Sequence, residues 1–170
     1  RENMEQKLRN AFIIGDQRLR INDIEFMVNQ LVEIAVRALS PGINDPFTAM
    51  SCIDQLGSGL SGLMARSIPH GYHYDSRGQL RLLTDSLTFS GIIEAAFNQI
   101  RQNASSDVAV PIRLLDALKA MAPHAQTREQ RDTLAKQAEM LNRSREEVPE
   151  KWDREDIQNR FDSVMKALRA

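Results

Sequence analysis

The sequence predicts a mainly α-helical bundle with one central apolar helix and a single short β-hairpin. Apolar residues recur at helical spacing through most of the 170 residues, and this spacing changes only around residues 68–84. The hydrophobic content of 42% is ample for a buried core. We expect a helical core domain at residues 1–125, with the hairpin at about 68–84, and a helical hairpin at residues 126–170 that packs on the core or on a partner.

The charge and the cysteine content argue against several classes of protein. The 22 basic and 23 acidic residues give a net charge of −1, so we expect no nucleic-acid partner. The single cysteine, Cys52, cannot form an intrachain disulfide and fits a reducing compartment. Its apolar neighbours indicate packing in the core. No run of about 18 apolar residues occurs, so we predict no membrane span within these residues.

The central helix is predicted at residues 22–39, a strongly apolar stretch with a wide apolar face, after a surface helix at about residues 2–14. Its polar positions form one row spaced by four: Glu25, Asn29, Glu33 and Arg37. Pro41 ends this helix because proline disrupts a helix interior. Asn44 or Asp45 can then cap a helix that begins at Pro46.

The helix predicted at residues 46–66 contains three glycines, each of which costs up to about 1 kcal/mol relative to alanine. These are Gly57, Gly59 and Gly62. We expect a neighbouring backbone to approach a face of small residues closely, namely Ser51, Ser58 and Gly62. A break in the helix near Gly57 is the alternative.

Two short strands, at residues 68–75 and 79–84, are predicted to form the hairpin and to lie on the bundle, since a lone hairpin is marginally stable. Further helices are predicted at residues 86–104 and 107–122, the second capped by Asp107. Thr127 and Gln130 match a capping box at the start of the next helix. Asp153 is the predicted cap of the last one.

The turn between the two apolar helices is the first candidate site. Free amides at the Pro46 helix start and the Arg37 guanidinium could together hold an anion or a polar ligand. The residues involved are Arg37, Ser40, Asn44 and Asp45. The alternative is a helix stop, a turn and a cap, with Arg37 bonded to carbonyls or to Glu33, and capping alone explains these residue types.

His73 and Asp75 are the second candidate, as metal ligands. Alternation along a strand places these two side chains on one face, whereas His70 points to the other. The set is incomplete against known zinc patterns, because no cysteine is available nearby. We therefore expect no metal, no cofactor and no catalytic residues, and nothing in the sequence indicates an enzyme.

The stretch Leu31–Ala49, LVEIAVRALSPGINDPFTA, resembles a bacterial family of predicted integral membrane proteins known as domain of unknown function 2254. The resemblance extends to residues 11–15, 95–101 and 113–115. It implies a longer protein with membrane-spanning helices ahead of this chain, which would be its soluble carboxy-terminal portion. It also implies the cell inner membrane as the location, with this domain on the cytoplasmic side.

From these observations we expect the soluble domain of a bacterial membrane protein that acts in assembly or sensing. The thin apolar seams of the last two helices favour a homo-oligomer through residues 127–168 as one form of assembly. The alternative is a small-molecule, anion or metal-binding domain with enzymatic activity. It would use the turn at residues 40–45 or the strand with His73 and Asp75.

Overall fold

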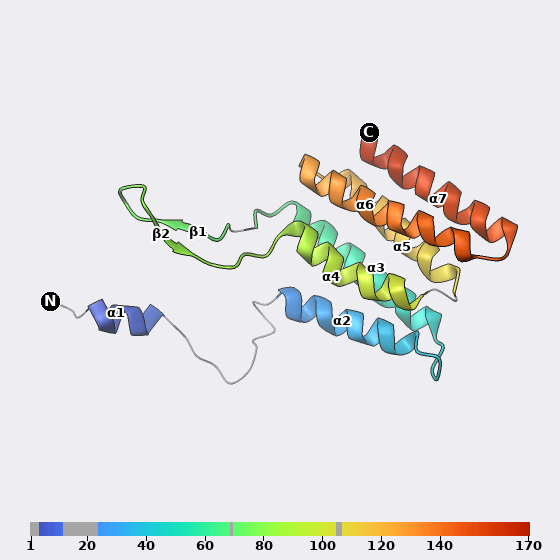
Figure 1. The fold of residues 1–170 in the computed structure, drawn as a ribbon, viewed down its shortest axis with the longest axis horizontal. Coiled ribbons are helices and arrows are strands. Elements are labelled where there is room, and N and C mark those ends of the chain that lie inside the picture. Colours follow the sequence, from blue (N-terminus) through green and yellow to red (C-terminus); the bar gives the residue numbers. More distant parts are fainter. Residues whose placement is uncertain (1–3, 12–23, 69, 105–106) are drawn as a thin grey trace.

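The computed structural model describes residues 4–11, 24–68, 70–104 and 107–170, and within them it is mainly helical with one antiparallel hairpin, as predicted (Figure 1). The α-helices, in chain order, are α1 (Met4–Ala11), α2 (Ile24–Ala38), α3 (Pro46–Met64), α4 (Phe89–Asn103), α5 (Ala109–Met121), α6 (Arg128–Ser144) and α7 (Lys151–Arg169). The strands are β1 (Tyr72–Tyr74) and β2 (Leu80–Leu83), and short 3-10 turns follow α5 and α6 at Ala122–His124 and Arg145–Glu147. Residues 2–3 and 12–14 of the predicted first helix lie outside the described residues.

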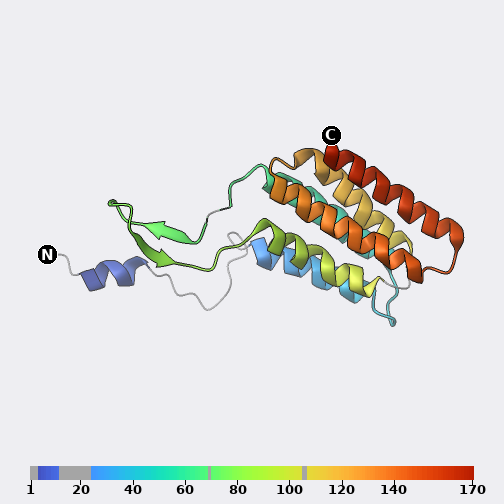
Figure 2. The same ribbon diagram turned by 45° about the horizontal axis from the view of Figure 1, so that its top comes forward.

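Helices α2 to α7 form a bundle in which the helix axes run roughly along its length (Figure 2). The helices follow one another across the bundle, and we call this row of helices the ladder. Helix α2 packs on α3 and α4, these two pack on α5 and α6 respectively, and α7 packs on α5 and α6. One continuous core runs through all six helices. The ladder therefore begins at α2 and ends at α7, with α3, α4, α5 and α6 between them.

The predicted central position of the apolar helix is wrong, because α2 lies at one edge of the ladder (Figure 1). Only one stripe of α2 is buried: Val28, Val32, Ala35 and Ala38. Met27 and Ile34 are 45% and 49% exposed on other sides of the helix. A high apolar content shows that a helix has much surface to cover, but it does not show that neighbours within the chain cover all of it.

Helices α3 and α5 make the most extensive contact in the bundle, and a glycine allows it. A Cβ added at Gly57 would lie 3.2 Å from the Cβ of Ala117 on α5, so the two helices approach where neither carries a large side chain. Helix α3 continues unbroken through Gly57. The predicted location of the close approach is wrong: Ser51, Ser58 and Gly62 are exposed, and the approach occurs at Gly57. A Cβ at Gly59 or Gly62 would meet nothing within 4 Å.

Local capping signals set most helix starts. Thr127 and Gln130 form the predicted capping box, and the Gln130 amide also donates to the carbonyl of Met64 at the end of α3 (3.1 Å). Asp107 accepts hydrogen bonds from the backbone amides of Ala109 and Val110 at the start of α5. The predicted cap Asp153 is wrong, because α7 begins earlier and its cap is Glu150, which accepts from a backbone amide of the first turn.

The last two helices pack on the rest of the chain. Helix α6 lies on α4, and α7 lies on α5. Their apolar seams are buried in the common core: Leu134, Ala138, Leu141, Ile157, Val164 and Leu168. Since intrachain contacts cover these side chains, an oligomer through residues 127–168, which stays a prediction, would have to use the outer surfaces of the two helices, which are mostly polar apart from the exposed Trp152.

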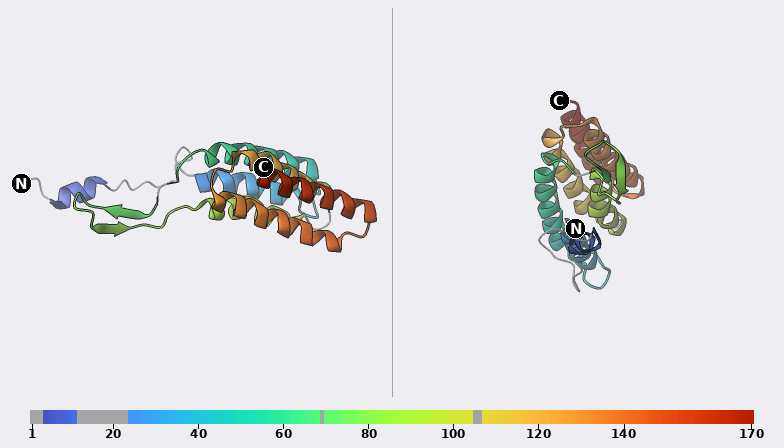
Figure 3. Two further views of the ribbon diagram at one scale, coloured as in Figure 1. Left: turned by 90° about the horizontal axis from the view of Figure 1, so that it is seen from above. Right: turned by 90° about the vertical axis from the view of Figure 1, so that its left-hand side faces the viewer.

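The hairpin does not lie on the bundle, contrary to the prediction, but projects beyond one end of it (Figure 3). Every residue of both strands is exposed. The hairpin is closed at its base, where the Thr84 amide donates to the Gly71 carbonyl (2.8 Å), and at its tip, where Gly78 has a positive φ of 73°. A Cβ at Gly71 would lie 1.9 Å from the Thr84 carbonyl oxygen, so this backbone approach requires glycine.

The contrast between two glycines of α3 tests the packing of the bundle. Gly57→Val should destabilise the fold by about 1–3 kcal/mol, because its methyl groups would push into α5. Gly59→Val, the matched control in open space, should leave the stability of the monomer unchanged or raise it by a few tenths of a kcal/mol. Urea unfolding followed by circular dichroism measures both, and equal midpoints for the two variants would contradict this account of the α3–α5 contact.

Candidate functional site

The turn between α2 and α3 is held by hydrogen bonds among its own residues. The Ser40 hydroxyl donates to the Arg37 carbonyl (2.7 Å), and the Asn44 amide donates to the Ser40 carbonyl (2.9 Å). The Asp45 amide reaches back to the carbonyl of Ala38 (2.8 Å). Asn44 has a φ of 50°, a left-handed conformation that asparagine adopts more readily than most residues. The turn therefore joins the two helices without a ligand.

Asp45 caps α3, as the sequence predicts for this position. Its carboxylate accepts hydrogen bonds from the backbone amide of Thr48 (3.1 Å) and from the Thr48 hydroxyl (2.5 Å), and Pro46 occupies the first turn. The Thr48 hydroxyl, followed by its amide, lowers the pKa of Asp45 below the ordinary value of 3.8. At neutral pH this carboxylate already fills the helix start that an incoming anion would need.

Arg37 lies in a different place from the cap. Its guanidinium pairs with the carboxylate of Glu33 (2.7 Å), and both side chains are about 70% exposed, so the pair adds little stability. Together with Asn29 and Gln99 the pair lines a hollow between α2 and α4, which Ser40, Asn44 and Asp45 do not line. Ligand binding by these four residues stays a prediction, and each of them has a structural contact in the fold.

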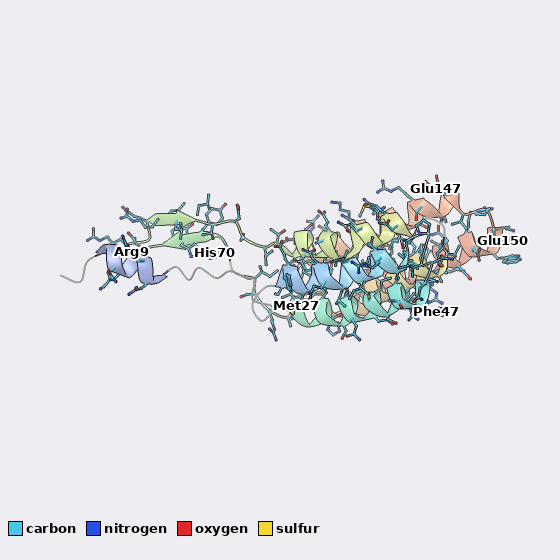
Figure 4. All side chains as sticks on the ribbon, turned by 90° about the horizontal axis from the view of Figure 1, so that it is seen from below. Arg9, Met27, Phe47, His70, Glu147 and Glu150 are labelled. Atoms are coloured by element: carbon cyan, nitrogen blue, oxygen red, sulfur yellow. The ribbon has the colours of Figure 1, made fainter. Side chains whose placement is uncertain are left out.

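The same turn exposes apolar side chains that the sequence analysis did not single out. Phe47, in the first turn of α3, is 76% exposed, and Ile43 in the turn is also exposed. Phe47 marks the end of the bundle that lies away from the hairpin, whereas His70 lies beyond the opposite end (Figure 4). Ile43 and Phe47 flank the predicted cap residues Asn44 and Asp45 in the sequence, and the capping pattern gives no sign of their exposure.

His73 and Asp75 each have other partners. A ring nitrogen of His73 lies 3.2 Å from the Thr84 hydroxyl oxygen across the hairpin. Asp75 follows β1 and accepts from the backbone amides of Arg77 and Gln79 and from the Arg81 guanidinium (2.8 Å). The Gln79 amide and then Arg81 lower the pKa of Asp75 below its usual value. Among the described residues no group of three or more His, Cys, Asp and Glu side chains is placed to hold a metal ion.

Cys52 lies on the core side of α3, in the packing role that its neighbours indicate. It is 6% exposed, and burial raises the pKa of its thiol above the ordinary value. A neutral, buried thiol is a poor nucleophile, because the thiolate is the reactive form. Cys52 therefore has the features of a packing residue.

An apolar groove between α2 and α3 is the surface feature that sequence reasoning missed. One wall is a stripe of α3 at helical spacing: Gln55, Gly59, Gly62 and Arg66. The other wall is one side of α2, with Met27 exposed and Ile24 and Leu31 partly buried. The groove encloses about 360 Å³ above a floor that includes Leu56 and Leu60. The sequence contained one indication of this groove, the two glycines spaced by three within a helix. It did not show that the side of α3 that carries these glycines is left uncovered.

The cap at Asp45 predicts a pH dependence of stability. The folded-state pKa is lowered, so the ionised carboxylate stabilises the fold above the unfolded-state pKa near 3.8, and this contribution is lost as the pH falls through the lower folded-state value. Asp45→Asn keeps a capping oxygen without this titration. The difference in urea midpoint between the native chain and this variant should shrink from pH 7 to pH 3, and a constant difference would contradict the assignment.

None of the helices in the described part of the chain combines the length and the hydrophobicity that crossing a bilayer requires. No solved structure matches this chain. Three curated relatives are uncharacterized proteins, one from Mycobacterium bovis and one from each of two strains of Mycobacterium tuberculosis. Each is 36% identical over 109 residues, which are 64% of this chain and 21% of the relative, so the match spans about a fifth of the relatives' length.

The family comparison covers more of the chain. Residues 1–120 match the predicted membrane proteins designated DUF2254, and this range includes the α2–α3 turn, the groove and the hairpin. These features are therefore part of the region that defines the family, whereas α6 and α7 lie beyond it. The chain belongs to this family of predicted membrane proteins.

Proposed function

We propose that this chain is the soluble assembly domain of a bacterial integral membrane protein, placed on the cytoplasmic side of the inner membrane. The family supports the membrane association, and the lone cysteine suits a reducing compartment. The observation that carries the assembly role is the apolar groove between α2 and α3. The partner that we propose for this groove is a second copy of the chain.

The two glycines of the groove support the proposal that a partner helix packs closely against α3. Gly59 and Gly62 each reduce the helix propensity of α3 by up to about 1 kcal/mol relative to alanine. Neither is required by the chain itself, since a Cβ at either position would meet nothing within 4 Å. Small residues on an open helix face allow another helix to approach the backbone closely. A partner helix in the groove would therefore account for both glycines.

The two walls of the groove are complementary to each other. Met27 forms a ridge, 45% exposed, on the α2 wall, and Gly59 and Gly62 form a furrow on the α3 wall. A two-fold axis along the bundle would set the ridge of each copy into the furrow of the other, which gives an isologous contact. Such a contact would cover the apolar surface that α2 exposes at the edge of the ladder.

Filling the furrow tests the self-association. Gly59→Leu should leave the monomer folded, because its side chain enters open space, and should weaken dimerisation at least about tenfold by blocking the Met27 ridge. Ala120→Leu, an exposed small residue on α5 outside the groove, is the matched control. Sedimentation equilibrium over a concentration series measures both variants. A native chain that stays monomeric at the highest concentrations would refute the self-association.

The side of the membrane can be tested by cysteine labelling in the membrane protein that carries this chain. Cys52 is buried and should not react, so an introduced Glu139→Cys on the exposed side of α6 becomes the labelled site. An impermeant maleimide should label inverted inner-membrane vesicles and leave intact spheroplasts unlabelled. Labelling of spheroplasts would place the domain on the outer side of the membrane. The chain without the added cysteine is the control.

A further inference from the structure

The hairpin carries an apolar face that nothing in the described chain covers. In its register Tyr72 lies opposite Leu83 and Tyr74 opposite Leu80, and residues paired in this way share a face. The irregularity between His73 and Tyr74 offsets the pairing, so that Leu80 and Leu83, three residues apart, reach the same side. We call these four residues the tyrosine–leucine face. Their exposed fractions are 52%, 60%, 50% and 66% for Tyr72, Tyr74, Leu80 and Leu83.

Specific residues define both ends of the hairpin, although no residue of its strands belongs to the core. Its base requires Gly71, and its tip combines Gly78 with the hydrogen bonds of Asp75 to the turn amides. An isolated two-stranded hairpin is only marginally stable in water. A hairpin with defined ends and an uncovered apolar face therefore has the features of an element that contacts a surface outside the chain.

The position of the hairpin restricts what that surface can be. Hairpin and α1 lie beyond the same end of the bundle, the end toward the amino terminus (Figures 1 and 3). Phe47 and the α7 cap Glu150 mark the other end (Figure 4). About four-fifths of each curated relative lies outside the matched segment, and the family is one of predicted membrane proteins. A membrane next to this end would meet α1 and the hairpin before it met the bundle.

We propose that the tyrosine–leucine face lies in the headgroup region of a lipid bilayer. Tyrosine is enriched at this depth because its ring is apolar while its hydroxyl stays hydrated, and leucine adds apolar contact with the acyl chains. Arg77 is exposed at the hairpin turn, where a guanidinium can bind lipid phosphate. This inference rests on the proposed function as a domain of a membrane protein.

The size of the face favours lipid over a second copy of the chain. Four half-exposed side chains of this size offer on the order of 400 Å². A stable protein interface buries roughly 800 Å² on each partner. A bilayer sets no such minimum, because a domain already attached to the membrane meets the lipid at high effective concentration. The small face is therefore adequate for a membrane contact and too small for a stable dimer by itself.

A tryptophan placed in the face tests the contact. Trp152 is the single tryptophan of the chain, and it lies two residues after Glu150 at the end away from the hairpin (Figure 4). A Tyr72→Trp reporter in a Trp152→Phe background is coupled, through a cysteine added at the amino terminus, to maleimide lipid in vesicles of phosphatidylethanolamine and phosphatidylglycerol. Cys52 is buried and does not compete. The emission should shift to shorter wavelength, and brominated acyl chains should quench it.

Matched chains show whether the tyrosine–leucine face is responsible. Trp152 in the otherwise native, coupled chain should show neither the shift nor the quenching. Adding Tyr74→Ser and Leu83→Ser to the reporter chain should lower the lipid-contacting fraction roughly tenfold or more. Leu82→Ser, which lies opposite His73 on the other face, should leave that fraction nearly unchanged. Circular dichroism should show an intact bundle in every chain.

The outcomes separate this inference from the proposed function. A coupled reporter without shift or quenching overturns the lipid contact. A shift without vesicles that depends on protein concentration overturns it in favour of a second copy. If the protein that carries this chain fractionates with membranes while the reporter stays unshifted, only the hairpin inference fails. If that protein is found in the soluble fraction of cells, the proposed function fails as well.

Discussion

The arrangement of the bundle depends on the close approach of α3 and α5. This contact is possible because Gly57 carries no Cβ where Ala117 approaches, and it is the most extensive helix pair of the fold. Because α5 covers that side of α3, α2 packs on the other side of α3. The second helix on which α2 packs is α4. Helix α2, which is strongly apolar, thus lies at the edge of the bundle, and the apolar surface that it leaves open is a consequence of the tight contact between α3 and α5.

What could be predicted from the sequence was mostly local. Helix starts at Pro46 and Thr127 follow from capping chemistry, which acts over three or four residues and is legible in any short segment. The place of α2 and the projection of the hairpin depend on which faces meet across the whole fold, and periodicity does not contain that information. The cap of α7 was missed because Glu150 and Asp153 offer similar carboxylates three residues apart.

The candidate site also shows that the sequence indicates local hydrogen bonding better than it indicates which surfaces are exposed. The turn at residues 40–45 stands out in sequence because its residue types are unusual, yet capping and backbone hydrogen bonds use them in the fold. The surfaces for which we propose a partner are the groove and the hairpin face, whose apolar side chains are ordinary in composition. Their exposure, which only the tertiary structure reveals, separates them from core residues.

The two proposed surfaces constrain each other. Ile24, Leu63 and Arg66 line both the α2–α3 groove and the hollow at the hairpin base, so the groove reaches the base of the hairpin, although none of the four residues of the tyrosine–leucine face lines that hollow. If two copies join through the groove and both hairpins rest on one bilayer, the two-fold axis must run along the bundle and perpendicular to the membrane. An antiparallel pair would direct the hairpins to opposite ends and leave one of them without lipid. A membrane contact through both hairpins would therefore select the parallel arrangement, which would also set the Met27 ridge at the level of the partner's glycine furrow.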